Sequence, residues 1–333
     1  MDTRIIDIRE DDICQRSPEL LATLLKDHTM SRKKGMDWNI FWATSDYEHL
    51  GEGFGYADQI MPENITGKYG KVVQPRTCKD RRTQVSRSRD KAEVFTPSWI
   101  CNAQNNLIDN AWFGREGVFN SENDDHTWTV NTDRITFPEG KTWKDYVRDT
   151  RLEITCGEAP YLASRYDTVT GEFIPIERRI GLLDRKLRVV SENCDSTTDW
   201  LEAAQEAYKS TYGYEWQGDS LLIARETLLY TFIEYYRLKF GKAPLDRSIK
   251  SIAYIISWNL WQMDGLRCVV PDSCGHSTVG VDIFGNTEEV ARPCEGCRTG
   301  GVHKHNGAYC LIRDWKNKKS KDKQIETFVK SLL

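Results

Sequence analysis

The sequence lacks a long apolar run, a signal peptide and a strong excess of charge of one sign. No stretch approaches the roughly 18–20 apolar residues that a membrane-spanning helix needs. The N-terminal residues MDTRIIDIREDDICQ are acidic and contain no apolar core of the secretory kind. Charged residues make up 29% of the chain, and the net charge is −4. We therefore expect a soluble globular protein with no membrane partner, located in the cytoplasm.

Three strand patterns stand out in the centre of the chain, which at 333 residues is long enough for one large or two medium domains. The first, 152–155, runs into a small-residue turn and then Pro160, which suits the first turn of a helix. The second covers 211–216 and the third 259–264, with amphipathic helical patterns between them. This alternation predicts an α/β fold with a parallel sheet and helices on its faces.

The ends of these strands predict where a ligand lies, because parallel α/β sheets bind ligands beyond the carboxyl ends of their strands. These ends would supply the turn at 156–159, Glu215 and Asp264. A carboxylate after the second strand can accept both hydroxyls of a ribose. One after the third strand can accept the exocyclic amine of an adenine. We therefore expect a cofactor that contains adenosine.

Four segments, in this order, resemble motifs of the adenine-N6 DNA methyltransferases of restriction–modification systems. They are AEVFTP (92–97), LEITCGEAPYL (152–162), YGYEWQGDSLLIARETLL (212–229) and NLWQMDGL (259–266). The resemblance covers residues 92–266. It implies a Rossmann-like methyltransferase domain, incomplete or diverged, that binds S-adenosyl-L-methionine and has DNA as a partner.

The resemblance also implies roles for individual residues. Thr96 would lie near the methionine end of S-adenosylmethionine, Glu215 would bind the ribose, and Asp264 would contact the adenine. The loop after the first strand would surround the cofactor with Glu153, Cys156, Gly157 and Glu158.

The loop departs from the family pattern at several positions. Glu153 replaces Asp, Ile154 replaces Pro, and Glu158 and Ala159 replace Thr or Ser and Gly. The loss of the glycine restricts the loop, because only Gly adopts a positive φ cheaply. A Glu158 side chain facing the cofactor would repel its carboxylate or bond to its ammonium group. The alternative is a nucleotide-shaped fold that holds no cofactor.

The family's base-binding tetrapeptide, [DNS]-P-P-[YFW], occurs nowhere in the chain. In the family it holds the flipped adenine. The segment 270–273 comes too early and lacks the second proline and the aromatic residue. The best positional candidates for a catalytic remnant are Asp314 and Trp315, which follow an apolar run at 309–313 that fits a further strand.

Cysteine and histidine are concentrated near the C-terminus. Ten cysteines in a chain of intracellular character indicate metal ligands or buried thiols more often than disulfides. Cys294 and Cys297 form a C-x2-C pair, a spacing at which two thiolates readily share one Zn²⁺. We expect Cys274 and Cys310 to complete a structural zinc site, with three substitutes, His276, His303 and His305. The alternative is a loop of reduced thiols.

We expect three regions. An N-terminal extension, 1–91, contains a helical pattern at 17–28 and a basic segment at 76–91 with seven basic residues against two aspartates. That segment would bind phosphates or form a solvated loop. The cofactor domain spans 92–266. A Cys/His-rich segment, 267–333, would hold the zinc, a strand and a C-terminal helix.

The leading functional hypothesis is a modification-type subunit of a restriction–modification or phage-related system. It would bind S-adenosylmethionine and DNA, as a relative of the adenine-N6 methyltransferases, and a second subunit would supply catalytic or recognition elements that this chain lacks. One alternative is a catalytically inactive relative that binds DNA or a partner protein. Another is a methyltransferase that acts on RNA or a small molecule.

Overall fold

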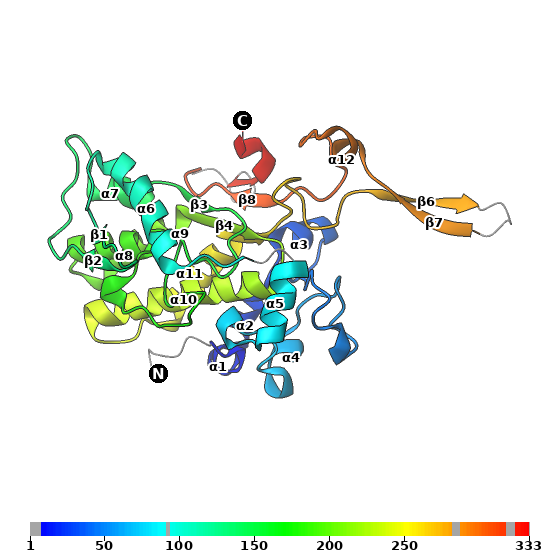
Figure 1. Cartoon of the computed structure of the whole chain (residues 1–333), viewed down its shortest axis with the longest axis horizontal. Helices are drawn as coiled ribbons and strands as arrows, with labels where there is room; N and C mark the ends of the chain where they lie inside the picture. Colours follow the sequence, from blue (N-terminus) through cyan, green and yellow to red (C-terminus); the bar gives the residue numbers. More distant parts are fainter. Residues whose placement is uncertain (1–7, 91–93, 282–286, 318–323, 333) are drawn as a thin grey trace.

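A parallel sheet lies at the centre of the computed structural model, which describes residues 8–90, 94–281, 287–317 and 324–332 (Figure 1). Its strands are β3 (Arg151–Glu153), β4 (Thr211–Glu215) and β5 (Leu260–Gln262), in the order β3-β4-β5. Leu152 pairs with Tyr212, and Tyr214 pairs with Trp261. The expected α/β architecture with a parallel sheet is therefore confirmed, with shorter strands than the sequence patterns suggested.

Helices follow the strands along the chain, as the strand–helix alternation predicts. Between β3 and β4 come α8 (Leu182–Asn193) and α9 (Thr197–Lys209). Between β4 and β5 come α10 (Gly218–Phe240) and α11 (Asp246–Asn259), which both contact β4 and β5. Because α10 is buried along most of its length, it forms the centre of the core.

The remaining described elements surround this centre. The helices are α1 (Glu10–Arg16), α2 (Pro18–Leu25), α3 (His28–Lys34), α4 (Pro62–Ile65), α5 (Arg81–Asp90), α6 (Ser98–Phe113), α7 (Trp143–Arg148) and α12 (Glu295–Thr299). Three antiparallel pairs complete the chain: β1 (Asn120–Glu122) with β2 (Trp128–Val130), β6 (His276–Val281) with β7 (Thr287–Arg292), and β8 (Leu311–Arg313) with β9 (Ile325–Thr327). The β6–β7 hairpin projects away from the body of the molecule (Figure 1).

The N-terminal residues share one core with the central block. The Phe41 backbone N–H donates to the side-chain oxygen of Gln262 (3.0 Å), and the Gln262 amide donates back to the Phe41 carbonyl (2.8 Å). The buried Arg225 of α10 donates to the carbonyls of Leu24 and Leu260. Residues 8–90 are therefore built into the same hydrophobic core as the sheet. The predicted boundary at 91/92 falls on residues outside the described part of the chain.

A second, smaller cluster covers the face of the sheet that carries Tyr214 and Trp261. It includes Cys310 and Ile312 from the β8 region and Phe328 from a short 3₁₀ helix, η6 (Phe328–Leu332). The apolar run at 309–313 thus does contain a strand, but β8 pairs with β9 in a separate sheet. Strand β9 and η6 occupy the stretch where a C-terminal helix was expected.

The helix expected to begin at Pro160 does not form. Residues 160–162 are a turn, and the next α-helix begins at Leu182. The Ala159 carbonyl accepts the N–H groups of Leu162 (3.1 Å) and Ala163 (2.9 Å), so the chain closes one turn and does not continue as a helix. The Glu153 carboxylate accepts the N–H groups of Tyr161 (3.4 Å) and Leu162 (3.2 Å) at the same turn.

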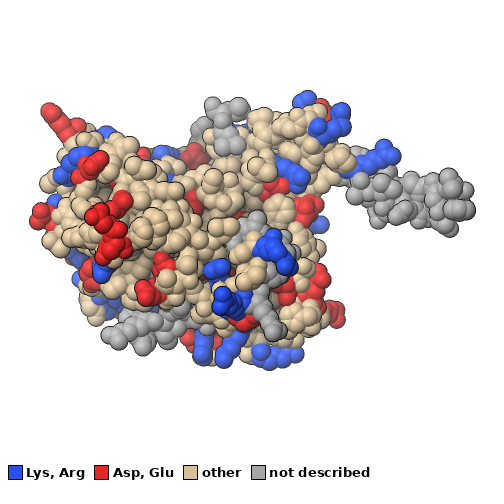
Figure 2. Space-filling view, in the orientation of Figure 1, with Lys and Arg blue, Asp and Glu red and all other residues tan. Residues whose placement is uncertain are grey.

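No helix in the described ranges is both long enough and apolar enough to cross a membrane. On the face shown in Figure 2, basic and acidic side chains are interspersed. The described residues therefore form no continuous basic patch on this face.

Candidate functional site

A cavity of about 810 Å³ opens at the carboxyl ends of β3 and β4. Its volume lies within the range of roughly 300–1,000 Å³ that is common for small-molecule sites. One wall is the loop at 153–157 together with Glu215, and the opposite wall comes from residues 94–96 and the middle of α6. Ala43 and Tyr56 from the N-terminal region also contribute. The cavity therefore lies where ligands of parallel α/β sheets bind.

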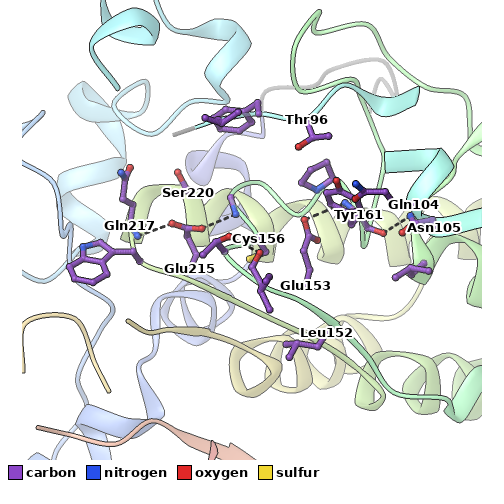
Figure 3. Close-up of a pocket in the computed structure, with 18 of the residues that line it drawn as sticks. Thr96, Gln104, Asn105, Leu152, Glu153, Cys156, Tyr161, Glu215, Gln217 and Ser220 are labelled. Atoms are coloured by element: carbon purple, nitrogen blue, oxygen red, sulfur yellow. Dashed lines mark hydrogen bonds between the residues drawn. The ribbon is translucent and has the colours of Figure 1, made fainter. Parts of the chain in front are cut away.

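Five of the seven cofactor residues predicted from the sequence line this cavity. They are Thr96, Glu153, Cys156, Gly157 and Glu215. In Figure 3, Glu153 and Glu215 follow one another along one wall, and Thr96 lies on the opposite side. Residues 94–96 of the AEVFTP segment thus line the same cavity as the loop after β3, whereas residues 92 and 93 lie outside the described part of the chain.

Glu153 provides a buried carboxylate at the end of β3. Its exposed fraction is 7%, and its two oxygens accept the long bonds from the Tyr161 and Leu162 N–H groups described above. Burial raises the pKa of Glu153 well above its ordinary value, and the nearby Glu215 adds to that rise. Glu153 takes part in no ion pair within the described ranges. A cationic group of a ligand would therefore be its natural partner.

Glu215 provides the second carboxylate, at the end of β4. Its oxygens accept the N–H groups of Gly157 (2.8 Å) and Gln217 (3.2 Å). Burial raises the pKa of Glu215 as well. Each carboxylate oxygen can accept a further hydrogen bond, so Glu215 can still accept two hydroxyl groups from a ligand. The bond to Gly157 joins the two strand ends.

The loop between the two carboxylates holds three residues at positive φ. Thr155 (46°), Gly157 (52°) and Ala159 (62°) all adopt left-handed conformations. Glycine tolerates this at no steric cost, whereas Thr and Ala do not. Ala159, which stands where the family has glycine, therefore takes the conformation that a glycine would favour, and the surrounding packing holds it there.

Glu158 does not line the cavity, which corrects the expectation that it faces the cofactor. Its carboxylate accepts the backbone N–H of Arg76 (2.6 Å) and the hydroxyl of Tyr166 (2.5 Å). The left-handed turn at Gly157 directs the following side chain away from the cavity. Glu158 thus attaches the 76–90 segment to the loop.

Asp264 is also absent from the residues that line the cavity. It lies two residues beyond β5, and its carboxylate accepts the N–H groups of Leu266 (3.0 Å) and Arg267 (3.1 Å). The Arg267 guanidinium also forms an ion pair with the Asp264 carboxylate, at 2.9 Å. Since Asp264 stabilises its own turn, the predicted contact with an adenine has no support in this arrangement.

The cavity lining has acidic side chains and no basic one among the described residues. Glu153 and Glu215 are the charged residues among those that line it, and no Lys or Arg occurs among the described lining residues. Sites for phosphate-rich ligands use basic side chains or helix N-termini. The cavity therefore favours a ligand with hydroxyls and positive charge over a polyphosphate.

Asn105 of α6 was not identified from the sequence. It is fully buried, lines the cavity, and donates both amide hydrogens, to the carbonyls of Tyr161 and Ile180 (3.0 Å each). These two bonds fix the amide orientation. Its side-chain oxygen has no hydrogen-bond partner within the described structure. The helix contains four asparagines, and nothing in the sequence distinguishes Asn105 from the other three.

Two cations of the basic segment, Lys79 and Arg87, pair with an acid inside the protein, whereas Arg81 and Arg89 are exposed. Asp219, at the start of α10, accepts bonds from Lys79 (3.1 Å), Arg87 (2.9 Å) and the hydroxyl of Tyr47 (2.7 Å). Arg87 is 1% exposed. The two cations hold the pKa of Asp219 below its ordinary value despite the opposing effect of burial. Lys79 and Arg87 therefore anchor the segment against α10, which neither of the two alternatives for it anticipated.

Asp314 and Trp315 lie outside the cavity lining. The Asp314 carboxylate accepts the N–H of Lys316 (2.9 Å), and the Trp315 indole donates to the Asn259 side chain (2.7 Å). Because β8 belongs to a separate sheet, its end does not meet the ends of β3 and β4. The positional argument for these two residues as catalytic groups is therefore not supported.

Four Cys and His side chains gather near the β6–β7 hairpin. One ligand atom from each of Cys274, Cys294, Cys297 and His305 lies within 4.8 Å of all the others, a group that could hold a metal ion. Cys310 is not part of this group. It is fully buried, and its thiol donates to the Gln262 carbonyl (3.3 Å). His305, one of the three predicted substitutes, completes the set instead.

Comparisons with protein-family models, with curated proteins and with solved structures found no match. The case for function therefore depends on the residues and their arrangement.

Proposed function

We propose that this chain is an S-adenosylmethionine-binding, modification-type subunit related to the adenine-N6 DNA methyltransferases of restriction–modification or phage-related systems. The observation that carries the proposal is the cavity at the ends of β3 and β4. It brings together five residues that the sequence motifs nominated separately, and it presents two carboxylates without a basic residue in the described lining.

The chemistry of the cofactor suits these charges. S-adenosylmethionine has a sulfonium, an α-ammonium group, ribose hydroxyls and a single carboxylate, and it has no phosphate. Glu215, beside Gly157, would accept the ribose hydroxyls. Glu153 would accept hydrogens from the ammonium end. A dinucleotide or ATP would instead bring its phosphates towards Glu153 and Glu215 with no basic side chain in the described lining, which is unfavourable.

The Rossmann-like character of the domain is part of the same proposal. Strand order β3-β4-β5 with helical crossovers supports it, and so does a ligand cavity at the strand ends. DNA as the partner rests on the resemblance of the motifs, and a second subunit would bring the base-binding element that this sequence lacks.

Isothermal titration tests cofactor binding. Wild-type protein should bind S-adenosylmethionine more tightly than ATP or NAD, and Glu215→Gln should weaken that binding about tenfold or more, as expected for a hydrogen bond to a charged group. Asp264→Asn is the matched control, because its carboxylate lies outside the cavity. Absence of binding by the wild type at about 1 mM cofactor, which corresponds to roughly −4 kcal/mol, would overturn the proposal.

A second candidate function is a catalytically inactive relative that binds DNA or a partner protein. It is favoured by the location of Asp314 and Trp315 outside the cavity lining, together with the missing tetrapeptide. Transfer of a tritiated methyl group to duplex DNA, to RNA or to neither separates the candidates. Cofactor binding without transfer to any acceptor, alone or with added cell extract, would favour the inactive relative.

A further inference from the structure

The Cys/His group lies outside the cavity and is independent of the proposed cofactor. Its members come from two stretches of chain on either side of the β6–β7 hairpin: Cys274 precedes β6, and Cys294, Cys297 and His305 follow β7. No other part of the proposed function uses these residues. Their arrangement therefore needs an explanation of its own.

The separations between the donor atoms fit a tetrahedral ion. The Cys274 and Cys297 sulfurs are 3.4 Å apart, and Nδ1 of His305 lies 3.4 Å from the Cys294 sulfur and 3.6 Å from the Cys297 sulfur. Four ligands around Zn²⁺, at about 2.3 Å for sulfur and about 2.0–2.1 Å for nitrogen, stand roughly 3.5–3.8 Å from one another. Three of the six separations thus match this geometry, and all six are within 4.8 Å.

A disulfide explains the group less well. Sulfur atoms in a disulfide are about 2.05 Å apart, whereas Cys274 and Cys297 are at 3.4 Å. A disulfide between two of the three cysteines would also leave the clustering of the third thiol and the imidazole unexplained. All three are free thiols in the structure.

The backbone around the group is shaped to bring the ligands together. A Cβ atom at Gly296, inside the C-x2-C pair, would lie 2.7 Å from both the backbone nitrogen and Nδ1 of His305. A Cβ atom at Gly307 would lie 2.8 Å from the Cβ of Cys274. Only glycine permits these two approaches. The two loops are thus packed against each other at the places where the ligands meet.

Hydrogen bonds join the same two loops. The side chain of Asn306 accepts the N–H of Gly275 (2.8 Å) and donates to its carbonyl (3.1 Å). Within the stretch after β7, the backbone N–H of His305 donates to the hydroxyl of Tyr309 (2.9 Å), which donates to the Val302 carbonyl (2.8 Å). Outer contacts of this kind orient metal ligands before the ion binds.

We propose that Cys274, Cys294, Cys297 and His305 bind one Zn²⁺ ion that joins the two ends of the β6–β7 hairpin. Three thiolates and one imidazole form a soft donor set that suits zinc and excludes Mg²⁺ and Ca²⁺, which prefer oxygen. With four protein ligands the coordination is complete. The ion is therefore structural, and it closes a loop that has few apolar residues of its own.

Elemental analysis of the purified full-length chain tests this assignment. Wild-type protein should contain one zinc per chain, and Cys274→Ser and His305→Ala should each contain well under half of one. Cys310→Ser is the matched control: its thiol is equally a cysteine of this region but lies against Gln262, so it should keep the full equivalent. Wild-type protein without zinc, both as purified and after incubation with zinc under reducing conditions, would overturn the proposal. So would loss of zinc in Cys310→Ser alone.

Cobalt substitution gives a second measurement if a variant fails to fold. Metal-free wild type loaded with Co²⁺ should show the intense visible absorption and thiolate charge transfer of tetrahedral cobalt, and Cys297→His should keep binding with a weaker charge-transfer band. An octahedral spectrum, or a mass showing one disulfide in freshly purified protein, would contradict the assignment.

Discussion

Two pairs of carboxyl groups in this protein differ in the groups that they contact. Asp219 and Glu234, both on α10, face basic side chains: Asp219 faces Lys79 and Arg87, and Glu234 faces Arg165 (2.8 Å) with Arg179 beside it. These cations lower the pKa of each carboxyl against the effect of burial. Glu153 and Glu215 are held by backbone N–H groups, and their pKa values are raised.

The difference indicates that Asp219 and Glu234 have a structural role, whereas Glu153 and Glu215 are available to a ligand. A buried carboxylate with a cation beside it is complete and connects two parts of the fold. A carboxyl group that lies at a cavity without a cation beside it can instead pair with a cationic or hydrogen-bonding group of a ligand. Glu153, 7% exposed, is almost as buried as Glu234, at 4%, so burial alone would not tell the two sets apart.

The largest expected effect comes from removing a paired carboxylate. Asp219→Asn leaves Lys79 and Arg87 buried without their shared partner, and breaking a buried ion pair in this way destabilises by roughly 3–5 kcal/mol. We expect the low end, because Asp46 still pairs with Arg87 (2.9 Å). Urea unfolding measures the loss. The matched variant Glu215→Gln should change the free energy of unfolding by about 1 kcal/mol or less. Equal losses of stability in the two variants would contradict the distinction between the ion-paired and the unpaired carboxyl groups.

The next effect is on binding. Glu153→Gln should weaken S-adenosylmethionine by roughly 10–100-fold, since a hydrogen bond to a charged group contributes about 1.5–3 kcal/mol. Methylthioadenosine, which lacks the amino-acid part of the cofactor, should bind the variant as it binds the wild type. Competition titration with both ligands provides the measurement. A parallel loss of both ligands would place Glu153 elsewhere along the cofactor.

The pH dependence of stability should have opposite signs in the two sets. Between the unfolded pKa of about 4.3 and its raised folded pKa, Glu153 binds its proton more tightly when folded, so its contribution to stability falls as pH rises through that window. Asp219, with a lowered pKa, contributes stability above about pH 4 that is lost on further acidification. Lowering the pH from 7 to 5 should therefore stabilise wild type relative to Glu153→Gln.

Urea unfolding of both proteins at pH 5, 6 and 7 checks this sign. A constant difference between wild type and Glu153→Gln across the three pH values would mean that Glu153 titrates alike in the folded and unfolded chains.

The smallest effect concerns the loop that separates the two cavity carboxylates. Thr155 is exposed and has φ of 46°, a strained conformation for a β-branched residue. Thr155→Gly should relieve about 1–2 kcal/mol of strain and lose roughly 0.5–1 kcal/mol to added freedom of the unfolded chain. The net expectation is a small stabilisation, measured by the urea midpoint. Thr129→Gly, in exposed strand β2 and without a positive φ, should destabilise instead.

The sequence could predict the residues whose positions are determined by the short stretch of chain around them. Strand–turn patterns identified the ends of β3 and β4, so Glu153 and Glu215 were placed correctly at one cavity. The C-x2-C spacing likewise nominated Cys294 and Cys297, two members of the Cys/His group. In each case a short stretch of chain contains both the residue and the geometry that positions it.

Other residues depended on contacts that no local pattern reveals. Asp264 follows its strand by two residues, and the turn to Arg267 takes its carboxylate away from the cavity. Glu158 is drawn to Arg76, 82 positions away. Cys310 and His305 are only five positions apart, and the side that each faces is decided by packing against Gln262 and by the close approach of Gly296.

The shared core of the N-terminal and central regions has a consequence for the order of events during synthesis. Phe41 is held by Gln262, which lies 221 residues further along the chain. At roughly 5–20 residues per second, a ribosome needs roughly 10–45 s to make the intervening residues. Throughout that interval the apolar side chains of α2 and of the Ile40–Trp42 stretch have no sheet to cover them. The nascent chain should consequently be a client of ribosome-associated chaperones until β5 emerges.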